Sequence, residues 1–203
     1  MYPSLQIVFI LTKNYDNLLI NQSGVFLIDY KIFESIHNLA GNNNSLDWVM
    51  SQLSTYGYIV FIAIILLLLV FPHKRKLGFI GFLSLVIALA VNRLLKVSID
   101  RARPFVDHEI DILIPKDPSP SFPSDQALIA GVFAGLFLFS NAKIGIKIGI
   151  IFIALLVIIS RVFVGHHYPA DVAVGFLLGG FISFLTKKII DRKRLEKVDK
   201  IPA

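Results

Sequence analysis

The chain has 203 residues, of which 55% are hydrophobic, with a mean hydropathy of +0.71 and a formal net charge of +6. A soluble domain of this length does not carry so many apolar residues in long blocks with so few charges, so a membrane protein is indicated. The basic residues lie at the ends of apolar blocks and in the tail rather than in a basic groove with interleaved aromatic side chains, which argues against a nucleic-acid partner. The absence of cysteine excludes disulfides, thiol nucleophiles and cysteine-ligated metals.

The N-terminal part carries the weakest pattern. The apolar stretch 5–11 is short and has no basic residue before it, so no cleavable signal peptide is expected, and residues 1–26 are treated as an arm of uncertain status. Beyond the arm, apolar residues recur at helical spacing and predict a helix that lies in the membrane interface or docks on the spans. These residues are Ile28, Ile32, Phe33, Ile36 and Leu39, with Asp29 away from the stripe.

Five apolar blocks predict transmembrane helices, at 56–71, 77–95, 127–139, 144–163 and 172–185. The third is shorter than the roughly 20 residues a span usually needs, so we expect it to begin in protein-lined space near Ser124. The predicted fold is therefore an all-α membrane protein, a bundle of five transmembrane helices plus the N-terminal helix. Residues 27–190 form one domain, and 191–203 form a basic tail.

Basic residues predict the orientation of the chain in the membrane. Lysines and arginines follow the first, third and fifth blocks, at 74–76, at 143 and 147, and from 187 onward. These places share one side of the membrane, which the positive-inside rule makes the cytoplasm. The C-terminus is thus expected in the cytoplasm, and the polar connections 96–126 and 161–171 are expected outside.

Three cations and a helix-capping serine on the outer connections suit phosphoryl transfer. This chemistry needs the negative charge of the phosphate oxygens to be stabilised around an immobile nucleophile. Lys96, Arg103 and Arg161 supply positive charge, and arginine adds planar bidentate bonds to phosphate. Ser124 precedes an apolar helix, where its hydroxyl and the following backbone N–H groups are suited to an anion.

A histidine and a carboxylate complete the candidate site. His167 can attack phosphorus as a neutral imidazole and leave a phosphohistidine. Asp171, four residues on, can bond the other ring nitrogen and stabilise the charge that develops. No cluster of acidic and histidine ligands suggests a metal, so the cations are expected to act in place of one and no cofactor is expected. His166 is interpreted as a structural neighbour because only His167 has the required spacing.

The order and spacing of these residues resemble the three-part signature of the type-2 phosphatidic acid phosphatase (PAP2) superfamily. The segment 29–37, Arg103-Pro104-Phe105-Val106 and the run 165–169 are similar to the bacitracin-resistance type of undecaprenyl-diphosphatase. The resemblance implies a multi-pass membrane lipid phosphatase with an extracytoplasmic active site, a lipid phosphate or diphosphate substrate, membrane lipids around it and no obligate protein partner. It also implies catalytic roles for His167 and Asp171. The substrate-binding residues that it implies are Lys96, Arg103, Ser124, Asp125, Gln126 and Arg161.

Gln126 departs from the family pattern, in which the second motif normally ends in a histidine that protonates the leaving group. Glutamine cannot deliver a proton, and loss of an acid costs roughly 10²–10⁴ in rate when the leaving group is a basic alkoxide. A departing lipid phosphate needs little protonation, so Gln126 favours an isoprenoid diphosphate such as undecaprenyl pyrophosphate as substrate. The alternatives are a monoester phosphatase acting on phosphatidic acid or phosphatidylglycerophosphate, and a weakly active lipid-phosphate binder.

Each residue also has an ordinary explanation when taken alone. Lys96 can be a snorkelling residue at a helix end, Ser124 only a helix cap, and His167 with Asp171 an ordinary i,i+4 contact. Their joint occurrence on one side of the membrane, in the family's order, favours the phosphatase interpretation.

Overall fold

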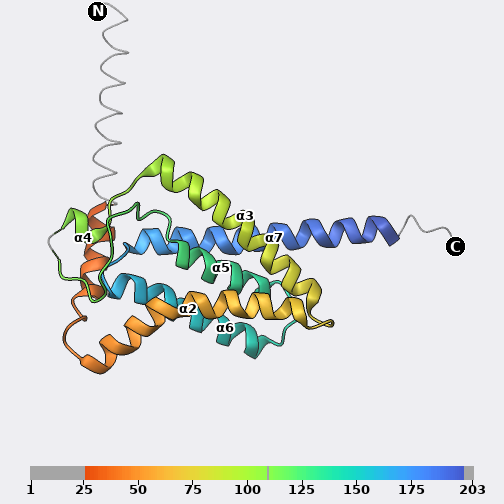
Figure 1. The fold of residues 1–203 in the computed structure, drawn as a ribbon, viewed down its shortest axis with the longest axis horizontal. Helices are drawn as coiled ribbons and strands as arrows, with labels where there is room; N and C mark the ends of the chain where they lie inside the picture. The colour runs from red at the N-terminus through yellow and green to blue at the C-terminus, as the bar shows by residue number, and fades with distance from the viewer. Residues whose placement is uncertain (1–25, 109, 199–203) are drawn as a thin grey trace, which may run out of the picture.

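The computed structural model describes residues 26–108 and 110–198, and this part of the chain is helical and contains no strand (Figure 1). Residues 26–37 form an N-terminal helix, and six labelled helices follow. Their bounds are α2 Asn44–Val70, α3 Arg75–Ile99, α4 Pro104–Asp107, α5 Asp125–Leu138, α6 Ile144–Phe163 and α7 Pro169–Val198.

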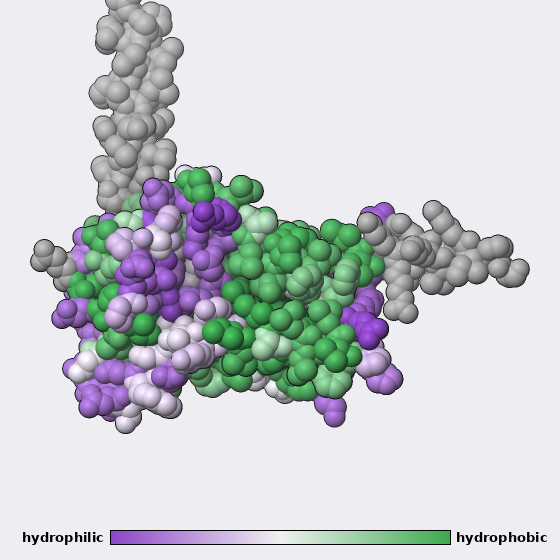
Figure 2. All heavy atoms as spheres, viewed as in Figure 1, coloured by the Kyte–Doolittle hydropathy of each residue, from purple (hydrophilic) through white to green (hydrophobic). Residues whose placement is uncertain are grey.

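Four of the described helices, α2, α3, α6 and α7, have the length and hydropathy to cross a membrane. Figure 2 shows a broad hydrophobic band over the helices between two more polar ends, as expected where lipid rather than water contacts the protein. The chain is thus a multi-pass membrane protein. The third predicted span coincides with α5, whose 14 residues fall short of that length, so the count of five spans stays a prediction.

Two helix ends differ from the predicted ones. α2 begins at Asn44 rather than Tyr56 because the Asn43 side chain caps it, accepting bonds from Ser45 N at 3.0 Å and Leu46 N at 3.1 Å. α7 continues to Val198, so the first part of the predicted tail 191–203 is helical. Residues 1–25 of the predicted arm and 199–203 of the tail lie outside the described residues.

The N-terminal helix docks on the bundle through a face that differs from the predicted stripe. Phe33 is 1% exposed and Asp29 is buried, whereas Ile28 and Ile32 are exposed. The apolar stripe therefore misplaced Asp29, which is buried because it forms an ion pair with Arg101.

The short helix α5 lies in the middle of the bundle and crosses α7 closely. All ten residues from Ala127 to Leu136 are buried. A Cβ on Gly131 would lie 2.0 Å from Phe176 O, and one on Gly179 would lie 2.1 Å from Leu128 O, so only glycine fits at these two positions. Small residues permit this kind of backbone contact between membrane helices. The crossing brings the N-terminus of α5 against the start of α7.

The helices alternate in direction, so the connections gather at two ends (Figure 1). One end holds the N-terminal helix, α4 and the connections 110–124 and 164–168. The opposite end holds the α2–α3 and α5–α6 turns.

Candidate active site

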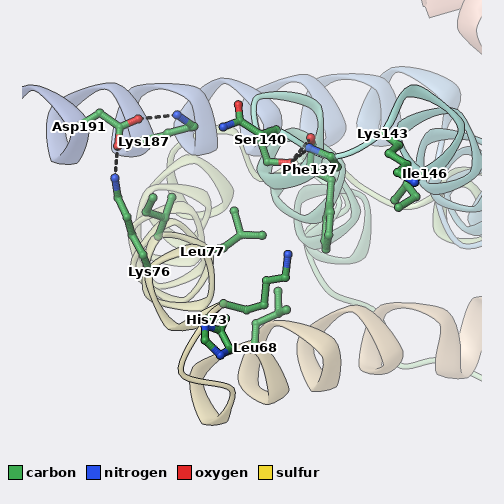
Figure 3. Close-up of a pocket in the computed structure, with 14 residues that line it drawn as sticks. Leu68, His73, Lys76, Leu77, Phe137, Ser140, Lys143, Ile146, Lys187 and Asp191 are labelled. Atoms are coloured by element: carbon green, nitrogen blue, oxygen red, sulfur yellow. Dashed lines mark hydrogen bonds and ion pairs between the residues drawn. The ribbon is translucent and has the colours of Figure 1, made fainter.

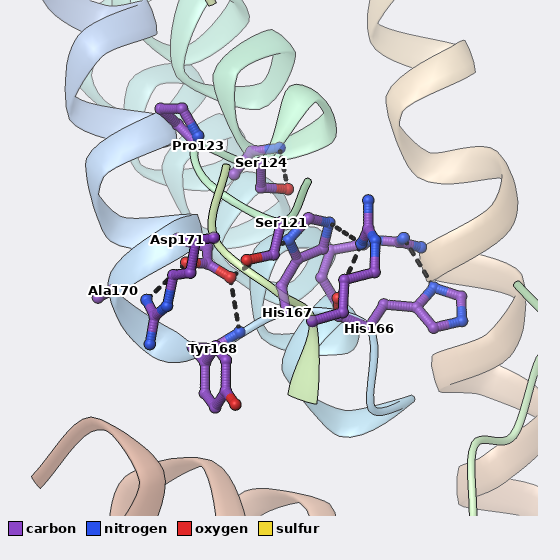
Figure 4. Close-up of polar contacts among 12 residues, drawn as sticks. Ser121, Pro123, Ser124, His166, His167, Tyr168, Ala170 and Asp171 are labelled. Carbon is purple, nitrogen blue, oxygen red and sulfur yellow. Dashed lines mark hydrogen bonds and ion pairs between the residues drawn. The ribbon is translucent and has the colours of Figure 1, made fainter. Parts of the chain in front are cut away.

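The predicted site residues converge at the end of the bundle that carries α4, and several of them are shown in Figure 4. Helix ends and connections supply them: Lys96 in the last turn of α3, Arg103 before α4, Ser124 before α5, Arg161 in the last turn of α6, His167 in the α6–α7 connection and Asp171 in the first turn of α7. None of these six residues is more than 9% exposed. A ligand must therefore displace existing contacts to reach them.

His167 presents an unprotonated ring nitrogen to the site. Its Nε2 lies 3.1 Å from Nη1 of Arg103, and because a guanidinium only donates, Nε2 accepts and the ring proton is assigned to Nδ1. Burial lowers the pKa of His167 well below its ordinary value, and the nearby cations Arg103, Arg161 and Lys96 lower it further. The imidazole is thus neutral at pH 7 with a lone pair on Nε2.

Asp171 lies beside the other ring nitrogen of His167 but does not yet bond it. The distance from Nδ1 to Asp171 Oδ2 is 3.6 Å, beyond hydrogen-bond length, and Nδ1 is buried without a partner among the described residues. Asp171 Oδ2 accepts from Tyr168 N at 3.0 Å instead. Such contacts are often long in unliganded sites and shorten when the ligand binds.

Arg101, which the sequence analysis did not single out, holds Asp171 from the opposite side. Its Nη1 donates to Asp171 Oδ1 and its Nη2 to Asp29 Oδ2, both at 2.7 Å, and the guanidinium lies over the Tyr168 ring at 4.0 Å. Asp29 Oδ1 also accepts from Ala170 N at 2.8 Å. One arginine thus ties the N-terminal helix to the start of α7. A second arginine two residues before Arg103 was the available signal.

The connection 110–124 occupies the guanidinium donors of Arg103. Ser119 Oγ accepts from Nε at 3.2 Å and from Nη2 at 3.1 Å, and Pro120 O accepts from Nη2 at 3.3 Å. An anion at this guanidinium would compete with Ser119 and Pro120 for these donors.

His166 positions Arg161. Its Nδ1 accepts from Arg161 Nη2 at 2.8 Å, and its Nε2 donates to Ile114 O at 2.7 Å. Burial and then the charge of Arg161 lower the pKa of His166 to about 3, which keeps the ring neutral in this role. Arg161 Nη1 donates to Ser54 O at 3.0 Å and to the Ser54 hydroxyl, and its buried Nε has no partner among the described residues. Sequence reasoning missed Ser54, whose only signal is a polar side chain near the start of the first span.

Asp125 contacts a cation rather than facing the site as a ligand for phosphate. It forms an ion pair with Lys96, and its Oδ1 accepts from Asn92 Nδ2 at 2.6 Å. A carboxylate repels phosphate, so this geometry favours a positioning role for Asp125. Asn92 lies one helical turn before Lys96, a spacing that could have identified it. Gln126 is half-buried, and no hydrogen bond of its side chain is found within the described part of the chain.

Lys116 adds a fourth cation from the connection 110–124. The residue is half-buried, two residues after Ile114 and three before Ser119. Burial lowers its pKa, and repulsion by Arg103, Arg161 and Lys96 lowers it further. The site thus has an excess of positive charge that an anion would relieve. Among residues 26–108 and 110–198, no three histidine or acidic side chains group as a metal site would require.

Comparison with known proteins agrees with this geometry. A model of the PAP2 superfamily matches residues 77–195. The chain is 33% identical over 169 residues to undecaprenyl-diphosphatase BcrC of Bacillus subtilis, covering 82% of this chain and 86% of the relative. It is 38% identical over 159 residues to an undecaprenyl-diphosphatase of Sulfolobus acidocaldarius, covering 77% of each. The crystal structure of Aquifex aeolicus LpxE superimposes with a TM-score of 0.69 at 25% identity, covering 78% of this chain and 94% of that one. The chain belongs to the PAP2 superfamily and is a membrane phosphatase.

Proposed function

We propose that the chain hydrolyses an isoprenoid diphosphate, undecaprenyl pyrophosphate, to undecaprenyl phosphate and inorganic phosphate. The observation that carries the proposal is the buried, neutral His167, whose Nε2 lone pair faces Arg103 among four cations. The two undecaprenyl-diphosphatase relatives support the choice of substrate.

The reaction proceeds in two steps through a phosphohistidine. His167 Nε2 attacks the terminal phosphorus, the bond from that phosphorus to the bridging oxygen breaks, and undecaprenyl phosphate leaves with the bridging oxygen. Asp171 moves onto Nδ1–H and stabilises the positive imidazolium, while Arg103, Arg161 and Lys96 hold the equatorial oxygens. Water then attacks the phosphohistidine, releases inorganic phosphate and restores neutral His167.

Gln126 supports a diphosphate rather than a monoester as substrate. It stands where the family normally has a histidine, and its amide cannot deliver a proton. A leaving phosphate is a weak base and departs without protonation, whereas an alkoxide does not.

Phosphate release from the purified chain tests the proposal. We expect undecaprenyl pyrophosphate to be hydrolysed in EDTA with a higher kcat/KM than phosphatidic acid, and vanadate to inhibit the reaction. A phosphate label trapped on His167 should be stable in alkali and lost in acid. Gln126→His should raise monoester hydrolysis more than diphosphate hydrolysis. A wild-type preference for phosphatidic acid would refute the assigned substrate. Activity that requires an added divalent ion would refute a mechanism in which lysine and arginine side chains act in place of a metal.

Gln126 also favours a second candidate, a broader but slow monoester phosphatase or a lipid-phosphate binder that has lost its acid. The same assay separates them. Hydrolysis of phosphatidic acid or phosphatidylglycerophosphate as fast as that of the diphosphate would indicate the monoester phosphatase. Tight binding of these lipids without phosphate release would indicate the binder.

The proposal also places the active site outside the cytoplasm, on the basis of the lysines and arginines at the opposite end of the bundle. The native chain has no cysteine, so single cysteines report the topology. Asp117→Cys, in the exposed connection before Ser119, should react with an impermeant maleimide in intact cells. Asn141→Cys, in the α5–α6 turn, should react only after permeabilisation. The reverse pattern would invert the topology.

A further inference from the structure

A pocket of about 760 Å³ lies at the end of the bundle opposite the candidate active site, between the ends of the long helices (Figure 3). Part of its wall is apolar and includes Leu68, Leu77, Ile80, Phe137 and Ile146. Figure 3 shows Lys143 and Ile146 on one side of it and Lys76, Lys187 and Asp191 on the other.

The pocket has more positive than negative charge. Four of its lining residues are lysines, at positions 74, 76, 143 and 187, against the single carboxylate of Asp191. That carboxylate is already shared, because Oδ1 accepts from Lys76 Nζ at 2.5 Å and Oδ2 pairs with Lys187. Within the described chain Lys74 and Lys143 form no ion pair, which leaves two cations to meet an anion.

We propose that this pocket binds the phosphodiester headgroup of an anionic phospholipid, with an acyl chain along the apolar wall. The cations account for the phosphate, and the apolar wall accounts for the chain. Phe71 and Ile144, which lie within two residues of the lining residues His73 and Lys143 in the sequence, are exposed apolar side chains. A free inorganic anion would use only the lysines. The site is separate from the His167 site, because its residues come from the opposite ends of α3, α5, α6 and α7.

Lipid retention measured by native mass spectrometry tests the proposal on the purified full chain. The chain is released from nanodiscs of phosphatidylcholine that contain a defined fraction of phosphatidylglycerol, a diester with no terminal phosphate for the active site to remove. We expect one phosphatidylglycerol to stay bound. Lys74→Gln combined with Lys143→Gln should weaken this binding about 25-fold, since each lysine near a lipid phosphate contributes about fivefold.

Lys147→Gln is the matched control because Lys147 lies one turn from Lys143 on α6 but does not line the pocket. It should leave lipid retention unchanged. Equal loss in the control and the double variant would mean diffuse surface attraction and would overturn the proposal. A thermal shift with inorganic phosphate alone, lost in the double variant, would identify the ligand as a free anion and would overturn the lipid assignment. If the wild-type chain retained phosphatidylglycerol but released no phosphate from the diphosphate substrate, the result would count against the proposed function and not against this lipid site.

Discussion

Arg101 Nη1 lies 2.7 Å from Asp171 Oδ1, so the carboxylate beside His167 is held by a cation that is not among the predicted site residues. The pair is nearly dry, with the Asp171 side chain at 0% exposure and that of Arg101 at 15%. A buried carboxylate that has lost its partner is costly. Arg101 therefore stabilises the charged form of Asp171 and holds the carboxylate beside Nδ1 of His167.

Arg101→Gln should lower kcat at least about tenfold, the value of one lost hydrogen bond to a charged group, with little change in KM. KM should be preserved because the guanidinium of Arg101 is paired with the carboxylates of Asp29 and Asp171 and is not expected to contact the substrate. Arg101→Lys should restore part of kcat, and Arg93→Gln, on the exposed side of α3, should change neither constant. A rise in KM as large as the fall in kcat would show that Arg101 binds the substrate.

His167→Ala should reduce phosphate release by about 10⁴-fold or more, because the cations cannot replace a nucleophile. Asp171→Asn should retain a small residual rate, since an amide can still orient the ring but cannot stabilise the imidazolium. Steady-state phosphate release and trapping of labelled phosphohistidine measure both. Circular dichroism of each variant checks that the helices remain. Near-normal turnover by His167→Ala would exclude a phosphohistidine mechanism.

The pH dependence follows from the lowered pKa of His167. The reactive form is neutral, so kcat/KM should show no loss from this residue as pH falls through about 6.5, where an ordinary histidine becomes protonated. Two substrates whose phosphates titrate at different pH values separate the enzyme from the substrate, because only the enzyme's inflection is shared. A shared inflection near 6.5 would contradict the assignment.

The free energy of unfolding should also depend on pH, through His166 and His167. Below about pH 6.5 the unfolded chain binds protons at His166 and His167 that the folded chain excludes, so the free energy of unfolding should fall as pH decreases through this range.

Lys116→Gln should raise KM for the diphosphate about three- to fivefold, as expected for one partly exposed cation near a phosphate. The kcat should stay within a factor of two because Lys116 belongs to the connection that covers the site. Lys31→Gln, an exposed lysine at the same end of the molecule, is the control for general loss of charge. Identical kinetics of wild type and Lys116→Gln would remove Lys116 from the site.

Gly179→Ala should destabilise the bundle by about 1–3 kcal/mol, the range for overpacking, because its Cβ would lie 2.1 Å from Leu128 O. Gly149→Ala on α6 is the matched control, since nothing lies within 4 Å of its Cβ. Thermal unfolding in detergent compares them. Helix propensity alone predicts a small gain for both substitutions, so a drop of the same size in both would mean that the α5–α7 crossing does not decide the effect.

Runs of apolar residues predicted the long helices well, and the block 144–163 coincides with α6. The motif residues lie together at one end of the bundle, as expected, because phosphate chemistry restricts which side chains serve it; their roles stay predictions. The residues that position the motif residues could not be predicted, since Asp29, Ser54 and Arg101 reach the site through contacts between segments distant in sequence. The start of α2 was missed because Asn43 caps a polar first turn that hydropathy does not detect.

The contact between α5 and α7 has a consequence for the response to the lipid environment. Ser124 N donates to Asp171 O at 3.1 Å, and a Cβ on Gly175 would lie 2.7 Å from Ser124 O, so the two motifs are joined backbone to backbone. A change in bilayer thickness that tilts α3 would move Lys96 and Arg103 relative to this unit but would leave Ser124 and Asp171 in register. Lipids of different chain length should therefore alter how tightly substrate binds far more than how fast the bound phosphate reacts.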